Sequence, residues 1–118
     1  MNVILGDENI KNIDSRYVVL ELDQIRVSAE SAPLTAFCLV EQLPLPEIPQ
    51  QHHYLELHKN LIKNYRQQNW KFCQDAIEHL IGRWRGELDT FYVDLLDRVN
   101  QHKSQEPAPD WDGVVNRF

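Results

Sequence analysis

Histidine and carboxylate side chains recur at helical spacing in the middle of the chain. His52 and Glu56 are four residues apart, as are Asp75 and His79. Two ligands at i and i+4 can share a metal ion, but neither pair forms an HExxH pattern and no third ligand follows at a matching spacing. We therefore expect no metal ion here. The histidines of the first stretch are expected to be solvated polar side chains: His52, His53 and His58.

The two cysteines, Cys38 and Cys73, are far apart and form no CxxC pair. This excludes the short-range spacing of a zinc knuckle or a thioredoxin-type redox site. We expect reduced, partly buried thiols in a cytoplasmic protein, where small cysteines mostly serve as packing residues.

Cationic side chains gather at Lys71, Arg83 and Arg85. Carboxylates alternate with them, so the pattern predicts a solvated charged face. The aromatic residues of the same region stand at helical spacing, which favours a packed core over a ligand cage. No glycine-rich phosphate loop, nucleophile elbow or catalytic carboxylate motif is present. The residues by themselves indicate a structural or interaction protein.

These side chains belong to a small globular chain. It has 118 residues, of which 42% are apolar, 25% are charged and four are glycine, which excludes a collagen, a coiled coil and a disulfide scaffold. A net charge of −6 argues against nucleic acid and against an anionic membrane as partners. Neither a membrane-spanning apolar run nor a signal peptide is present, so we expect no direct membrane contact and a cytoplasmic location.

The first part of the chain predicts strands. A short apolar run at 2–5 precedes residues 17–27, which are rich in β-branched and aromatic side chains. Every second residue from Val18 to Leu22 is apolar, and the alternation then changes phase, which predicts a β-bulge near Asp23. A turn and a second run at 34–41 complete a hairpin.

A proline-rich connector follows the hairpin. Pro44, Pro46 and Pro49 cannot continue a central strand or a helix interior, and they favour an extended, semi-rigid segment. The net charge changes at the same place, from −5 over residues 1–48 to −1 over residues 49–118. The expected organisation is a strand region at 1–43, a connector at 44–49, a helical region at 50–105 and a tail at 106–118.

The second part of the chain predicts three helices. Apolar residues recur at helical spacing over 50–67, then from Trp70 to Trp84, and again after Asp89. Asn69 and Asp89 are the expected N-caps of the second and third helices. The connections are short, so the helices should be antiparallel neighbours. The predicted fold class is α+β: an N-terminal β-hairpin or small antiparallel sheet followed by a three-helix C-terminal bundle.

The first two predicted helices resemble the middle of a tetratricopeptide repeat. Tyr65 ends one helix, and Trp70, Cys73, Ile77 and Leu80 follow on the next, with small and large apolar positions alternating. The small Cys73 side chain would let the two helices approach closely. One such unit cannot bury its faces alone, so the strands or another chain must cover it.

A longer ordered pattern resembles the C-terminal end of bacterial class III adenylate/guanylate cyclases. The last strands of that family's catalytic domain are similar to 22–27 and 35–40, and a helical extension with ordered tyrosine, tryptophan, aspartate and arginine positions follows. The extension closes on DWDGV after prolines, as here. The residues that carry the resemblance are Tyr65, Trp70, Cys73, Asp89, Tyr92, Arg98, Pro107, Pro109, Asp110, Trp111, Asp112 and Gly113.

The resemblance implies a segment without catalytic residues. The family's metal-binding aspartates, base-selecting residues and transition-state residues precede the part that this chain matches. Its phosphate-contacting lysine and the next glycine fall at Ser28 and Ala29, and serine supplies no positive charge. The resemblance therefore implies that this chain alone is no cyclase and holds no cofactor. Mg²⁺ or Mn²⁺ is expected only in a catalytic parent protein.

Two functions stay open from the sequence. The first is a non-catalytic regulatory or structural C-terminal portion of a nucleotide cyclase-like signalling protein, in contact with the rest of that chain or with a second copy. Open strand edges would favour a homodimer, including a strand-swapped one. The alternative is a stand-alone protein-interaction module built on a single repeat-like helical hairpin.

Overall fold

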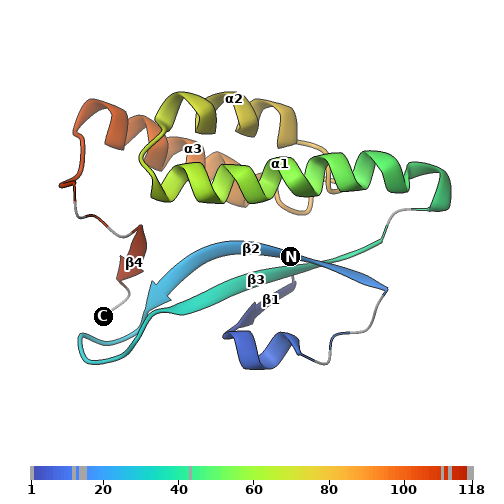
Figure 1. Ribbon diagram of the computed structural model, residues 1–118, viewed down its shortest axis with the longest axis horizontal. Coiled ribbons are helices and arrows are strands. Elements are labelled where there is room, and N and C mark those ends of the chain that lie inside the picture. Colours follow the sequence, from blue (N-terminus) through green and yellow to red (C-terminus); the bar gives the residue numbers. More distant parts are fainter. Residues whose placement is uncertain are drawn as a thin grey trace.

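A four-stranded mixed sheet lies beneath a layer of three helices (Figure 1). The computed structural model describes residues 2–11, 13, 16–42, 44–109, 111 and 113–116. The strands are β1 (Asn2–Leu5), β2 (Tyr17–Arg26), β3 (Leu34–Glu41) and β4 (Val114–Asn116), and the helices are α1 (Ile48–Arg66), α2 (Trp70–Leu80) and α3 (Asp89–Ser104). This arrangement confirms the predicted α+β class, with the helices following the main strands.

The central hairpin joins β2 and β3 in antiparallel register, with Leu20 opposite Cys38. The register shifts between Glu21 and Gln24, where β2 carries one residue more than β3. This confirms the predicted bulge. The extra residue turns the following side chains back toward the helices, so Ile25 packs against the core.

Both edges of this hairpin are paired within the chain. β1 runs antiparallel to β3, and β4 runs parallel to β2, which gives the order β1-β3-β2-β4. The expected sheet was antiparallel throughout, so the parallel β4 from the tail is an addition. Three residues are too few for alternation to reveal a strand. The outer edges now belong to short strands, which limits pairing between molecules.

The proline-rich connector is helical rather than extended over much of its length. A 3₁₀ turn at Leu45–Glu47 leads directly into α1 at Ile48. The prediction of an extended segment is wrong here because proline is tolerated in the first turn of a helix, where its missing N–H has no intrahelical acceptor. Pro49 is the second residue of α1 and fits this exception.

The helix starts predicted at 69–70 and 89 are correct within one residue, and Asn69 is the N-cap residue of α2 as predicted, whereas the predicted cap Asp89 is wrong. Asn69 and Leu88 occupy the N-cap positions, and neither makes a side-chain cap hydrogen bond. Asn69 Nδ2 donates instead to Asn64 Oδ1. Asp89 is the first residue of α3, and its carboxylate accepts a hydrogen bond from the Gly82 N–H at 2.7 Å. It therefore ties the α2–α3 connection to α3.

The second helix is shorter than predicted. α2 ends at Leu80, and the chain then turns through Gly82 and Gly86, both with positive φ. Trp84 lies within these turns and is 2% exposed. Its burial holds the connection against the core instead of extending the helix.

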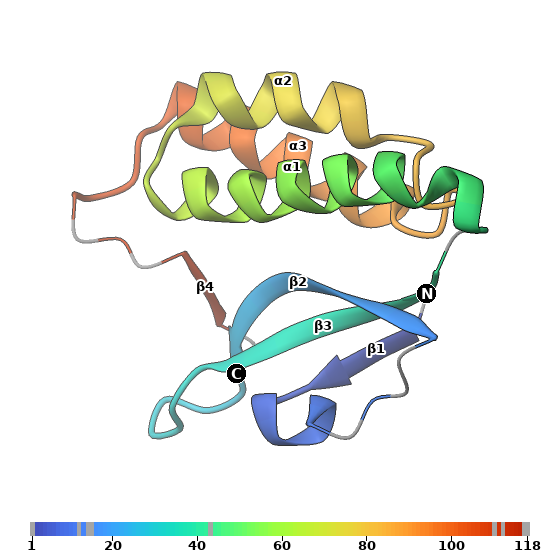
Figure 2. The same ribbon diagram turned by 45° about the vertical axis from the view of Figure 1, so that its right-hand side comes forward.

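Side chains from both parts of the chain form one hydrophobic core. Leu20 and Cys38 of the sheet belong to the same buried cluster as Leu61, Ile77 and Leu95 of the three helices. Figure 2 shows the helices stacked over one face of the twisted sheet. The strand and helical regions therefore share their burial, although the sequence suggested two unlike halves. None of the helices in the described residues is long and apolar enough to cross a bilayer.

Candidate functional site

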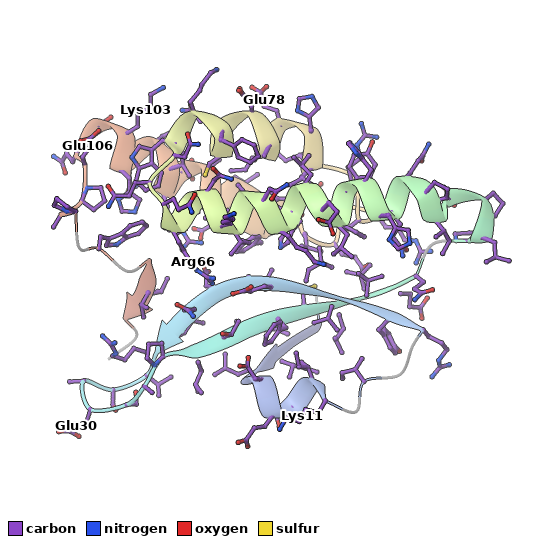
Figure 3. All side chains as sticks on the ribbon, viewed as in Figure 1. Lys11, Glu30, Arg66, Glu78, Lys103 and Glu106 are labelled. Carbon is purple, nitrogen blue, oxygen red and sulfur yellow. The ribbon has the colours of Figure 1, made fainter. Side chains whose placement is uncertain are left out.

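The bulge in β2 carries two carboxylates that meet arginines from the helices. Asp23 accepts two hydrogen bonds from Arg98 of α3, both at 3.1 Å. Glu21 accepts one from Arg66 of α1 at 2.5 Å. Figure 3 shows Arg66 extending from α1 toward β2. Glu21 and Asp23 alternate with the core residues of β2 and would face away from the helices in a regular strand. The bulge interrupts this alternation, so their side chains can reach groups on the helix-covered side of the sheet.

Arg98 is the more enclosed of the two arginines, with its side chain 21% exposed. Its guanidinium lies 3.3 Å from Asp94 and over the ring of Tyr65, 5.7 Å from the centroid. Burial by itself lowers the pKa of Arg98, but the hydrogen bonds and charge of Asp23 outweigh it and raise that pKa. The arginine is a permanently charged fastener between sheet and helix, and its bidentate geometry fixes their relative position.

A second polar network crosses the core at His58. Its Nδ1 lies 2.9 Å from Tyr92 Oη, and its Nε2 lies 2.5 Å from the backbone oxygen of Glu21. The carbonyl can only accept, so Nε2 carries the proton and Nδ1 accepts from the Tyr92 hydroxyl. That hydroxyl in turn accepts from Trp84 Nε1 at 3.1 Å. One neutral tautomer of His58 therefore satisfies every polar atom in this series of hydrogen bonds, from the Trp84 indole to the Glu21 carbonyl.

The prediction that His58 is solvated is wrong, because the side chain is completely buried. Burial lowers the pKa of His58 to about 4, against the smaller raising effect of the Glu21 carbonyl. The imidazole is neutral at pH 7 and serves as a hydrogen-bond relay between α1, β2 and α3. His52 and His53 are exposed, as predicted.

Four aromatic rings form a cluster where α1, α2, α3 and the tail meet: Tyr65, Trp70, His102 and Trp111. His102 stacks on Trp70 with centroids 5.1 Å apart, and Trp111 lies 5.2 Å from Tyr65 and 4.8 Å from His102. The ring spacing leaves the aromatic faces occupied by one another. This confirms the predicted core role of the aromatic residues and makes the cluster a lock for the tail.

The terminal motif enters this cluster through Trp111 and Gly113. Gly113 is buried and has a φ of 76°, and a Cβ there would lie 3.2 Å from Arg66 Cγ. Glycine is therefore needed both for the backbone conformation and for the close approach to α1. Pro107 is half-buried and Pro109 exposed. The motif residues Asp110 and Asp112 lie outside the described residues.

Both cysteines are buried and unpaired. Burial raises the pKa of Cys38 to about 11 and that of Cys73 to about 12, so neither thiol ionises at neutral pH and neither is a nucleophile. Cys73 Sγ lies 3.9 Å from the Leu61 carbonyl oxygen. The predicted close approach of the first two helices at this small side chain is confirmed.

Ser28, the position matched to the cyclase lysine, lies in the turn between β2 and β3. Its backbone N–H donates to Ser31 Oγ, and that hydroxyl donates back to the Ser28 carbonyl. These contacts shape the turn, and Arg26 Nε donates to the Ser31 carbonyl at 3.2 Å, so the arginine is engaged in holding the turn. Within the described residues no group of three or more histidine, cysteine, aspartate or glutamate side chains could hold a metal ion.

The structure therefore places four of the residues singled out in the sequence in two structural networks. Tyr65, Trp70 and Trp111 share the aromatic cluster, while Tyr92 belongs to the His58 network. Sequence reasoning missed Glu21 and Asp23 as partners of the helices. The phase change in β2 was the available signal, because it marks where side chains leave the regular alternation.

These networks hold the elements of the fold together. Three groups with perturbed pKa values, His58, Tyr92 and Arg98, each meet a defined partner inside the fold. No protein-family model, curated protein or solved structure matches this chain significantly.

Proposed function

We propose that this chain is a non-catalytic protein-interaction module. The observation that carries the proposal is that three reactive side chains, His58, Tyr92 and Arg98, are engaged with structural partners in the interior. The hydrogen bonds from Trp84 through Tyr92 and His58 to the Glu21 carbonyl form a satisfied buried network, and such networks make a fold rigid and specific, which suits a scaffold that presents a surface. Arg98 is held by its two bonds to Asp23, while its buried Nε has no hydrogen-bond partner among the described residues. A catalytic site needs such groups free to meet a substrate.

The surface that this scaffold offers is a groove between α1 and α2. A cavity of about 330 Å³ lies there, lined by His53, Leu57, Phe72, Asp75, Ala76 and His79. Leu57 and Phe72 are half-buried and supply an apolar floor, while the two histidines are exposed at its rim. Paired helices hold extended or helical peptides in grooves of this kind. The repeat-like hairpin is thus the recognition element.

Cross-linking of the native protein tests this function. Lys71 stands beside Asp75, to which it is paired at 3.1 Å, and so lies next to the groove. Lys11 lies beneath the sheet (Figure 3) and serves as the control position. We expect a stoichiometric complex in the source extract with cross-links from Lys71 and none from Lys11. Cross-links confined to Lys11, or a native protein that carries no partner, would contradict the module.

A second function is favoured by one specific observation. Four of the described residues that match the cyclase C-terminus, Tyr65, Trp70, Trp111 and Gly113, converge around the end of α1. A motif whose members pack together is a folding unit that a larger chain could retain. On this second proposal the chain is the regulatory C-terminal portion of a cyclase-like protein, and its partner is the rest of that protein or a second copy.

The size of the native protein separates the two functions. An antibody against this chain should reveal a band near 13.9 kDa in the source lysate if it is a stand-alone module. A band several times larger supports the cyclase-like parent. In that case the purified parent should form cyclic nucleotide with Mg²⁺ or Mn²⁺, whereas the 118-residue chain should form none.

A further inference from the structure

A polar cavity lies where the α1–α2 groove meets the turns between α2 and α3. Its volume is about 320 Å³, and its lining includes Arg83, Arg85, Tyr54, Gln50 and Glu47. The groove and the cavity are joined by direct contacts. The ring of His53 packs on that of Tyr54, and Arg83 Nε donates to the His79 carbonyl. An extended segment in the groove would therefore reach the cavity without leaving the surface.

The turns after α2 are built to present two arginines together. Trp84 is buried and hydrogen-bonded to Tyr92, so it anchors the middle of the connection. Arg83 and Arg85 flank it and are both exposed. Arg85 has a φ of 54°, a conformation that side-chain-bearing residues rarely adopt. Backbone outliers of this kind persist where the surrounding fold enforces them, and they cluster at binding sites.

Neither arginine is committed to a strong internal partner. Arg83 lies over the Tyr54 ring at 4.8 Å, which orients its guanidinium, and no carboxylate partner of Arg83 occurs among the described residues. Arg85 lies 3.8 Å from Glu41, a pair with both side chains about half exposed or more. Exposed pairs of that length contribute little, so a ligand can displace Glu41. Lys71, the third member of the predicted basic patch, is instead paired with Asp75 on α2.

The charges of the lining select the kind of anion. Once Glu41 has left Arg85, the two guanidiniums and the carboxylate of Glu47 leave one positive charge in the cavity, within a chain of net charge −6. A single carboxylate matches that balance and the bidentate geometry of arginine, whereas a phosphate dianion or a polyanion meets repulsion from Glu47 and from the whole protein. The apolar floor of the adjoining groove requires hydrophobic side chains next to that carboxylate.

We propose that Arg83 and Arg85 bind a carboxylate side chain of an acidic, apolar-flanked peptide segment of a partner protein, held in the α1–α2 groove. This inference rests on the proposed interaction function and adds the chemistry of the partner. Arg83 is the preoriented contact, because its position over the Tyr54 ring and its hydrogen bond to the His79 carbonyl fix the orientation of its guanidinium. Arg85 completes the clamp when it leaves Glu41.

The test uses the full chain and a short blocked peptide that alternates leucine with aspartate. The reference peptide has asparagine in place of aspartate. Binding is followed by fluorescence anisotropy and by the NMR shifts of the Gly82 and Gly86 amides, which border the arginines. We expect saturable shifts with the acidic peptide and an affinity lower by about tenfold or more in the double variant Arg83→Gln/Arg85→Gln.

A matched double variant controls for net charge. Lys63→Gln/Lys103→Gln removes the same two positive charges from exposed positions on α1 and α3, and its affinity should stay within about twofold of the parent. The variant Arg83→Lys/Arg85→Lys keeps charge without the planar fork and should bind the acidic peptide with intermediate affinity. The side chains changed in all three double variants are exposed, so we expect their thermal unfolding to match the parent's, and that match verifies folding.

Four outcomes would overturn the inference. Equal binding of the acidic and asparagine peptides would remove the carboxylate clamp while leaving the groove as a docking site. Equal loss of affinity in Arg83→Gln/Arg85→Gln and in Lys63→Gln/Lys103→Gln would reduce the effect to general charge attraction. The absence of saturable shifts, or displacement of the peptide by inorganic phosphate at lower concentration than by glutarate, would remove the peptide carboxylate as occupant. The cross-linking result from Lys71 judges the proposed function separately.

Discussion

Acid should unfold this protein at a higher pH than its surface charges alone would predict, because His58 is buried in its neutral form. The neutral imidazole accepts from Tyr92 and donates to the Glu21 carbonyl while completely buried. A proton on Nδ1 turns the acceptor into a donor and places a charge in the core. The substitution His58→Gln removes the titrating group and keeps a side chain that can both donate and accept hydrogen bonds.

The magnitude follows from the two pKa values of this histidine. It is about 6.5 in an unfolded chain and about 4 in the folded protein. The unfolded chain therefore binds the extra proton between these values, so stability is complete above about pH 6.5 and falls as the pH falls toward about 4. Relative to pH ~8, the linkage predicts a loss of about 2 kcal/mol at pH ~5 and about 3 kcal/mol at pH ~4.

Urea unfolding at a series of pH values measures this loss. The protein should lose stability steeply between about pH 6.5 and 4, whereas the His58→Gln variant should start lower and lose about 2 kcal/mol less by pH ~5. His52→Gln is the matched control, because His52 lies in the same helix and is exposed. It should follow the parent curve.

One result would refute the reasoning. If the parent and His58→Gln free energies of unfolding run parallel from pH 7 to 4.5, the proton is not excluded from the folded core. Loss of the carboxylate ion pairs at low pH cannot mimic the predicted difference, because Asp23 and Glu21 are present in both proteins and cancel in the comparison.

Three further substitutions test the fastenings described above. Trp111→Ala should cost about 3 kcal/mol, because it leaves a void in the aromatic cluster and frees the tail that forms β4, and urea unfolding with hydrogen exchange at Val114–Asn116 checks both effects. Asp23→Asn should cost about 2 kcal/mol, because the enclosed Arg98 then keeps only the exposed Asp94 as a counter-charge, while Asp75→Asn in an exposed pair should cost under about 0.5 kcal/mol in the same assay. Gly113→Ala should lower stability by about 1–2 kcal/mol through its positive φ and its contact with α1; a melting temperature equal to the parent's would contradict that packing.

Local patterns were sufficient for much of the fold. The strand at Leu34–Glu41 has the predicted bounds, and the bulge appears where the alternation in β2 changes phase. The inward residues predicted for the third helix are buried: Phe91, Tyr92, Leu95 and Val99. These features depend on side-chain periodicity within a segment, which a sequence displays directly.

Local patterns failed where a residue's role depends on a partner far along the chain. His58 was grouped with two exposed histidines, because its position on α1 does not reveal that a strand carbonyl and a tyrosine of α3 will enclose it. β4 escaped notice for a similar reason. Its three residues acquire strand geometry only by pairing with Gln24–Arg26 of β2.

The sequence by itself determined the order of β1 to β3 and of the three helices, most of the faces that they bury and the lack of recognisable catalytic motifs. The tertiary structure alone decided the fastenings: Arg98 meets Asp23 across 75 residues, and Trp84 pins a turn so that Arg83 and Arg85 line one cavity. The physical reason is the distance along the chain over which each interaction acts. Periodicity reports the face a segment will bury, whereas the pairing of charges and hydrogen bonds depends on which faces then meet and at what distance.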